Sequence, residues 1–126
     1  MVGSMIITPR LILHYVRNVT DVWAANEPRP PEDPYEYTRL ILKMLNDAAA
    51  RGERDALGLA IQYVLKHPEI DAGPLVSEVF PYSDEKAREL LEIVLELSEA
   101  PSHPPGPSID SLEWGDMPLE DWRRSR

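Results

Sequence analysis

The fold is decided by residues 33–68, DPYEYTRLILKMLNDAAARGERDALGLAIQYVLKHP. Apolar residues recur in this stretch at spacings of three and four, which places them on one face of each of two helices. Gly52 is suited to end the first helix, and Pro68 stops the second, which is predicted over about residues 54–67. Because only residues 51–53 join them, the two helices are expected to pack as an antiparallel hairpin.

Residues that begin helices stand before this hairpin and before an earlier helix. Asp33, followed by Pro34 and Glu36, has the pattern of a capping box, in which the aspartate and glutamate side chains each bond the other's backbone N–H. Thr8 and Pro9 mark the start of the earlier helix as N-cap and first helical residue.

Two more helices are predicted after the hairpin, a short one within residues 74–80 and a longer one over about 84–99, capped by Ser83. No segment shows the alternation of apolar and polar residues that is typical of a half-buried strand. We therefore predict an all-α fold, a compact bundle of four to five helices.

Composition divides the chain near residue 100. Residues 5–100 form the predicted helical bundle domain, whereas residues 101–126 begin with a Pro-rich linker and end in an acidic tail that contains two tryptophans. Residues 1–4 have the composition of a cloning remnant and enter no functional argument.

The charge and composition exclude several functions. The chain carries 13 Lys and Arg against 22 Asp and Glu, a net charge of −9, and such a protein is repelled by nucleic acids and anionic membranes. It has no cysteine, which excludes disulfides, thiolate metal ligands and a thiol nucleophile. It also lacks the apolar runs of a signal peptide or a membrane helix, so we expect a cytoplasmic protein with neither a nucleic-acid nor a membrane partner.

Motifs for catalysis, cofactors and metals are missing from the sequence. His14 lies in the earliest predicted helix, and His103 lies in the Pro-rich linker. His67 lies in the last turn of the helix predicted over about residues 54–67, where it can cap free carbonyls. We assign no catalytic residue, no cofactor and no metal site, and expect a protein that is not an enzyme. The open alternative is a small enzyme or ligand-binding bundle in which His14 or His67 meets a buried acid.

One charge pattern is sharper than the composition requires. Five glutamates step by four, three, four and three along the last long helix, within an arc of about 80° opposite its apolar stripe. This glutamate row consists of Glu85, Glu89, Glu92, Glu96 and Glu99. We expect Lys86 and Arg88, which flank the row, to relieve part of the repulsion, notably through pairing of Arg88 with Glu85 or Glu92. The row is either a solvated face that keeps the protein soluble or a docking surface for a basic protein.

The tail holds a second set of candidate binding residues, Trp114, Leu119 and Trp122. Tryptophan buries a large area and is seldom left in water, so these residues are expected to dock somewhere. We expect the tail to fold back on the bundle, the alternative being that it docks on another chain.

The leading hypothesis is a non-catalytic module that occupies or neutralises a basic protein. In size, acidity and the pattern of residues 37–80, a helix pair followed by LVSEVF at 75–80, the chain resembles the small helical immunity proteins and inhibitors that neutralise bacterial toxins. The alternative is a scaffold or assembly subunit that acts through homo-oligomerisation, for which Leu42, Leu59 and Tyr63 should form an exposed apolar patch.

Overall fold

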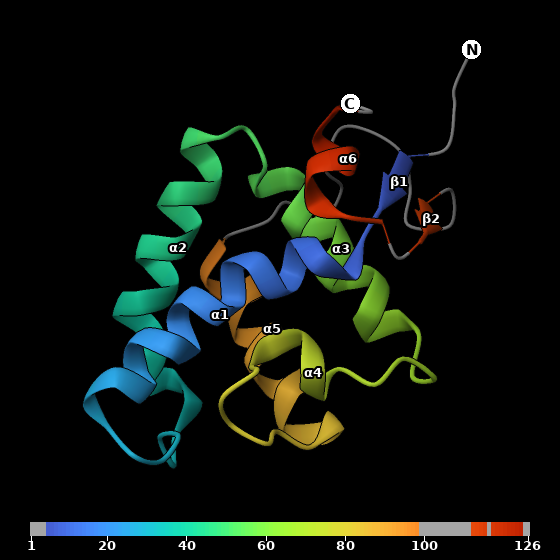
Figure 1. Cartoon of the computed structure of the whole chain (residues 1–126). Helices are drawn as coiled ribbons and strands as arrows, with labels where there is room; N and C mark the ends of the chain where they lie inside the picture. Colours follow the sequence, from blue (N-terminus) through green and yellow to red (C-terminus); the bar gives the residue numbers. More distant parts are fainter. Residues whose placement is uncertain (1–4, 99–111, 116, 125–126) are drawn as a thin grey trace.

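The computed structural model describes residues 5–98, 112–115 and 117–124 of the chain. In chain order the elements are β1 (Met5–Ile7), α1 (Pro9–Asn26), the 3-10 helix η1 (Pro34–Tyr37), α2 (Thr38–Ala50), α3 (Arg54–Lys66), α4 (Gly73–Val76), α5 (Asp84–Ser98), β2 (Leu112–Trp114) and α6 (Leu119–Arg124) (Figure 1). The prediction of an all-α fold is confirmed, because helices make up most of the described residues. These residues contain six α-helices where four to five were predicted, and the helix that the prediction missed is α6, in the tail.

The helix starts follow the capping residues of the sequence. The Thr8 side chain accepts a hydrogen bond from the backbone N–H of Arg10, and Pro9 takes the first position of α1. Asp33 and Glu36 form the predicted capping box at η1, which continues directly into α2. These starts are local in origin, since each cap bonds a backbone group within three residues of itself.

Helices α2 and α3 are joined at Gly52, whose φ of 69° is the left-handed conformation that favours glycine after a helix. In Figure 1, α2 rises to this turn and α3 descends from it. Helices α2, α3 and α4 each pack against both α1 and α5, and α1 crosses in front of α5 in this view. The core therefore lies between α1 on one side and α5 on the other.

Helix α4 is shorter than the segment 74–80 predicted for it. It ends at Val76, because the hydroxyl oxygen of Ser77 accepts hydrogen bonds from the backbone N–H groups of Val79 and Phe80, at 3.1 and 2.9 Å. A serine that bonds the backbone ahead of it favours a turn over a continued helix.

The two strands form a small parallel pair that the sequence pattern did not indicate. Met5 pairs with Leu112 and Ile7 with Trp114, and the N–H of Gly115 donates to the carbonyl of Ile7 at 3.1 Å. Three residues per strand are too few for alternation to be recognised. The pairing brings residues 112–115 to the start of α1, at the opposite end of the described chain.

Candidate partner-binding face

The described glutamates of the row, Glu85, Glu89, Glu92 and Glu96, are exposed along one side of α5. The other side of the helix is buried in the core through Ala87, Leu90, Leu91 and Val94. Glu99 lies outside the described residues. The helix thus holds four carboxylates on a rigid support, with one turn between successive members.

Two contacts fix members of the row. The hydroxyl of Tyr35 in η1 donates to Glu96 at 2.7 Å, and this bond raises the pKa of Tyr35. The amino group of Lys86 lies 3.9 Å from a carboxylate oxygen of Glu89. Within the described part of the chain, Glu85 and Glu92 have no cationic partner. Most of the negative charge of the row is therefore available to a partner.

The prediction that Arg88 pairs with Glu85 or Glu92 is wrong. Its guanidinium group donates to one carboxylate and three backbone carbonyls, of Asp84 (2.9 Å), Val64 (2.7 Å), His67 (3.1 Å) and Ile70 (2.6 Å). The last carbonyls of a helix lack partners within it, so Arg88 caps the end of α3. This use of Arg88 turns it away from the row.

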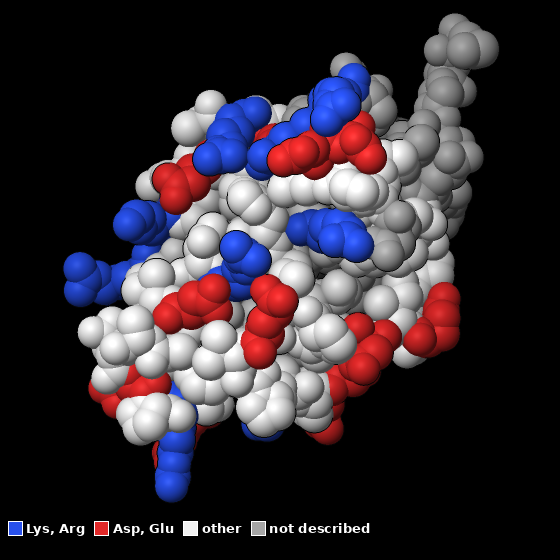
Figure 2. Space-filling view, viewed as in Figure 1, with Lys and Arg blue, Asp and Glu red and all other residues white. Residues whose placement is uncertain are grey.

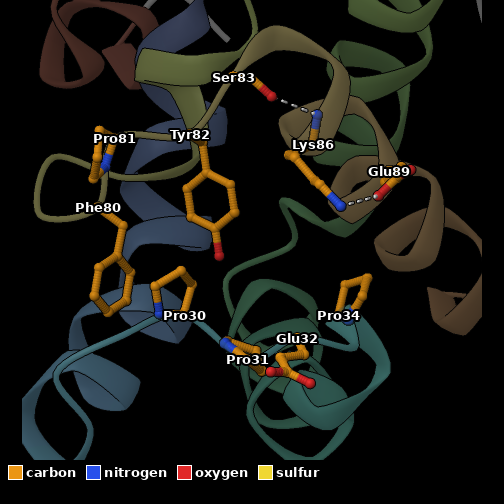
Figure 3. A pocket seen from close by; sticks show the side chains of 10 residues that line it. All are labelled: Pro30, Pro31, Glu32, Pro34, Phe80, Pro81, Tyr82, Ser83, Lys86 and Glu89. Carbon is orange, nitrogen blue, oxygen red and sulfur yellow. Dashed lines mark hydrogen bonds and ion pairs between the residues drawn. The ribbon is translucent and has the colours of Figure 1, made fainter.

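A pocket of about 430 Å³ opens beside the first turns of α5 (Figure 3). Its walls are apolar and are formed by Pro30, Pro31, Pro34, Phe80, Pro81 and Tyr82. Its polar lining residues are all exposed and lie at the mouth, namely Glu32, Ser83, Lys86 and Glu89. Because Glu89 belongs to both features, the pocket and the glutamate row form one continuous surface.

Aromatic contacts hold the walls of this pocket in place. The hydroxyls of Tyr82 and Tyr37 are hydrogen-bonded at 2.7 Å, and burial raises the pKa of both groups. The indole N–H of Trp23 donates to the carbonyl of Arg29 at 2.7 Å, and its ring meets Tyr37 edge-on at 5.3 Å. Trp23 thereby ties the proline-rich loop between α1 and η1 to the bundle.

A second polar cluster lies in the interior, around Glu53. This carboxylate is only 3% exposed, accepts a hydrogen bond from the Tyr15 hydroxyl, and receives two bonds from Arg123 at 2.7 and 2.8 Å. Burial and the neighbouring carboxylate raise the pKa of Tyr15 to about 12. In the sequence, Glu53 is visible only as a residue of the link between two helices, because both of its partners lie far away along the chain.

The described part of the tail packs against the bundle. Trp122 is 1% exposed and belongs to the core. Trp114 stacks on Tyr63 with ring centroids 4.9 Å apart, and Tyr63 stacks in turn on His67 at 3.9 Å. Leu119 is half-buried against the core. Of the residues predicted to bind a partner, those of the tail are thus engaged within the chain, and those of α5 are exposed.

The two described histidines, His14 and His67, each contact an aromatic ring. The Nδ1 atom of His67 lies 2.8 Å from the carbonyl of Tyr63, at the end of α3. Burial and the positive charge of Arg123 lower the pKa of His14, which meets Tyr15 edge-on. His103 is outside the described residues, and those described contain no group of three His, Cys, Asp or Glu side chains suited to a metal ion.

Charge is distributed differently on the face of the molecule that carries α1. Figure 2 shows acidic and basic side chains interspersed over the upper part of this face and acidic side chains alone along its lower right. Arg17 and Glu78 form one exposed ion pair there, with 3.3 Å between the charged atoms. The charge of this face is therefore partly mixed, whereas along α5 the carboxylates of the row follow one another at each turn.

The apolar patch expected of a scaffold protein is not formed by its three predicted members. Leu42 is exposed on α2, whereas Leu59 is buried in α3 and Tyr63 is covered by Trp114 and His67.

In the described part of the chain, no helix has the length and apolarity needed to cross a bilayer.

Comparison of the chain with protein-family models, with curated proteins and with solved structures finds no match.

Proposed function

We propose that this protein is a non-catalytic, acidic helical module that binds a basic protein through the glutamate row of α5, and thereby occupies or neutralises it. The observation that carries the proposal is the exposure of Glu85, Glu89, Glu92 and Glu96 on one side of a helix whose other side is in the core. Carboxylates on a rigid helix give a partner a fixed charge pattern, which favours specificity and fast association.

The energetics of the row agree with such a role. Like charges one turn apart destabilise a helix by roughly 0.2–0.5 kcal/mol per pair. Of the neighbouring cations, Lys86 reaches Glu89, while Arg88 is used to cap α3. Lysine or arginine side chains of a partner, spaced along the row's length of about 16 Å, would remove this repulsion. The interaction should weaken with salt, since the screening length is about 8 Å at physiological ionic strength.

The small helical inhibitors that the sequence resembles supply a model of how such a surface acts. A basic enzyme or nucleic-acid-binding protein uses its cations to hold an anionic substrate, and a row of carboxylates competes for the same cations. Binding alone then blocks the partner, so that the module needs no catalytic group. The tryptophans of the tail contact residues within the chain and stabilise the bundle, so recognition of the partner is assigned to the row alone.

The proposal is tested by capture from a lysate with two charge-reversed variants. The row variant carries Glu89→Lys, Glu92→Lys and Glu96→Lys. The control carries Asp21→Lys, Asp47→Lys and Glu69→Lys, which are exposed acids outside α5. Both variants change the net charge equally. We expect one basic protein to be captured by the wild type and the control, to be released by high salt, and to be lost with the row variant. Equal capture by both variants would refute the role of the row.

A further inference from the structure

The pocket beside α5 has the properties of a site for an apolar side chain. Its volume of about 430 Å³ lies within the range of about 300–1,000 Å³ usual for ligand sites. Four of its six apolar lining residues are prolines, which have no backbone N–H to offer, and the hydroxyl of Tyr82 is already bonded to Tyr37. A polar ligand would find few partners on these walls, whereas an aliphatic or aromatic group would be well covered.

The mouth of the pocket determines which charge can accompany that apolar group. Glu32 stands at one side and Glu89 at the other, while the amino group of Lys86 is directed to Glu89 (Figure 3). Glu85 lies one turn before Glu89 on the same side of α5. An anionic ligand would be repelled here, and cations on either side of an apolar group would be attracted.

Apolar surface extends beyond the mouth. Among the described residues, the large hydrophobic side chains that are exposed include Tyr35, at 49%, and Val79, at 56%. In the sequence these two are neighbours of Pro34 and Phe80, and Val79 lines a second hollow that shares Phe80 with the pocket. Exposed apolar side chains beside a cavity, such as Val79, are typical of a surface that binds another protein.

We infer that this pocket receives one large aliphatic or aromatic side chain of the basic partner, from a segment whose flanking lysines or arginines pair with Glu85, Glu89 and Glu32. This inference rests on the proposed function and specifies the partner segment as a single apolar anchor between cations. The two parts of the surface act differently: the carboxylates attract and orient the segment, and the pocket slows its release, as a buried anchor does in other interfaces.

The test uses two synthetic peptides, acetylated and amidated, with the sequences Lys-Lys-Leu-Lys-Lys and Lys-Lys-Gly-Lys-Lys. Binding to the ¹⁵N-labelled full chain is followed by NMR at low salt. We expect both peptides to shift amide signals of α5, but only the leucine peptide to shift those of Phe80 and Tyr82. The leucine peptide should bind roughly tenfold more tightly, as burial of one such side chain implies.

A tryptophan at the mouth provides the decisive variant. Lys86→Trp places a large ring over the pocket and removes a cation, so electrostatics alone would strengthen the binding of both peptides. Because the ring covers the pocket, we expect the variant to bind both peptides equally well and so to lose the preference for leucine. The matched control, Lys43→Trp on exposed α2 surface, changes the charge equally and should retain that preference.

Each other outcome has a definite meaning. Equal affinity of the two peptides, with shifts confined to α5, would overturn the inference and leave the row as a binding surface. Tight binding of neutral N-acetyl-leucinamide that is unaffected by reversal of the row would indicate a small-molecule pocket and overturn the inference. Absence of shifts with either peptide would overturn the inference, while the capture experiment would still decide the proposed function.

Discussion

Glu53 shows how much a single residue can depend on parts of the chain that are remote in sequence. A carboxylate with 3% of its surface exposed is costly unless it is paired, and Glu53 is paired through Tyr15 on α1 and Arg123 on α6. Three elements thus meet at one side chain. Its hydrogen bond and charge raise the pKa of the Arg123 guanidinium.

Glu53→Gln is expected to lower the free energy of unfolding by roughly 1.5–3 kcal/mol, because it removes the charge opposite Arg123 while keeping the size of the side chain. Urea denaturation at pH 7 measures the change. Glu120→Gln, at an exposed position of α6, serves as the control and should change stability by less than about 0.5 kcal/mol. Equal stability of the two variants would mean that the buried pair contributes nothing.

Tyr15 makes stability depend on alkaline pH. Its pKa of about 12 in the folded protein exceeds the value of about 10 expected in the unfolded chain, so the folded state holds the proton more tightly. Its contribution to stability is therefore complete below pH 10 and is lost as the pH rises from about 10 towards 12. Urea denaturation at several pH values should show a smaller decline for Tyr15→Phe than for the wild type, with the remainder due to Tyr37 and Tyr82. The same decline in both proteins would contradict this assignment.

Among the helices and turns, the features that could be predicted are those that depend on residues close together in the sequence. The caps at Thr8 and Asp33 and the turn at Gly52 depend on neighbouring residues, and each was found where the sequence predicted it. The length of α4 and the partners of Arg88 were missed, because each was decided by a competing contact. A helical pattern cannot indicate that Ser77 will bond the backbone ahead of it, nor which free carbonyls a distant arginine will reach.

In the candidate site too, the local pattern could be predicted and the long-range contacts could not. The glutamate row was visible in the sequence because it lies on one helix, where spacing determines direction. The pocket was not visible, since its walls come from the loop before η1 and from the segment between α4 and α5. Pro31 and Phe80 come together only when the chain folds, and no spacing in the sequence indicates that they do.

Gly73 is the point at which α4 closely approaches the segment that forms the pocket wall. A Cβ atom there would lie 2.5 Å from the carbonyl oxygen of Tyr82, so Gly73→Ala must displace the backbone and should cost about 1–3 kcal/mol. Gly58→Ala is the control, because a Cβ at that helical position meets nothing within 4 Å and should stabilise α3 by about 0.5–1 kcal/mol. Thermal unfolding of both variants measures the difference, and a neutral Gly73→Ala would show that this approach is loose.

For the molecule as a whole, the described parts of the two ends close onto one another. β1 precedes α1, and β2 and α6 follow the linker, yet the ladder at Ile7 and the bond from Thr8 to the carbonyl of Met117 at 2.8 Å join them. Trp122 then completes the core. The sequence indicated that the tryptophans needed a docking site, and burial of Trp122 in the core removes its large surface from water.

Because the tail packs on the bundle, its tryptophans are expected to stabilise the protein, while the glutamate row of α5 is proposed to recognise the partner. Substitution of each tryptophan tests this assignment. Trp122→Ala removes a core side chain and should cost about 3–5 kcal/mol in urea denaturation. Trp114→Ala removes one stacked ring from a half-buried site and should cost about 1 kcal/mol, leaving a folded protein. Because α5 is unchanged in it, Trp114→Ala should capture the basic partner as the wild type does. Loss of capture with this folded variant would transfer recognition from the row to the tail, whatever the row contributes to solubility.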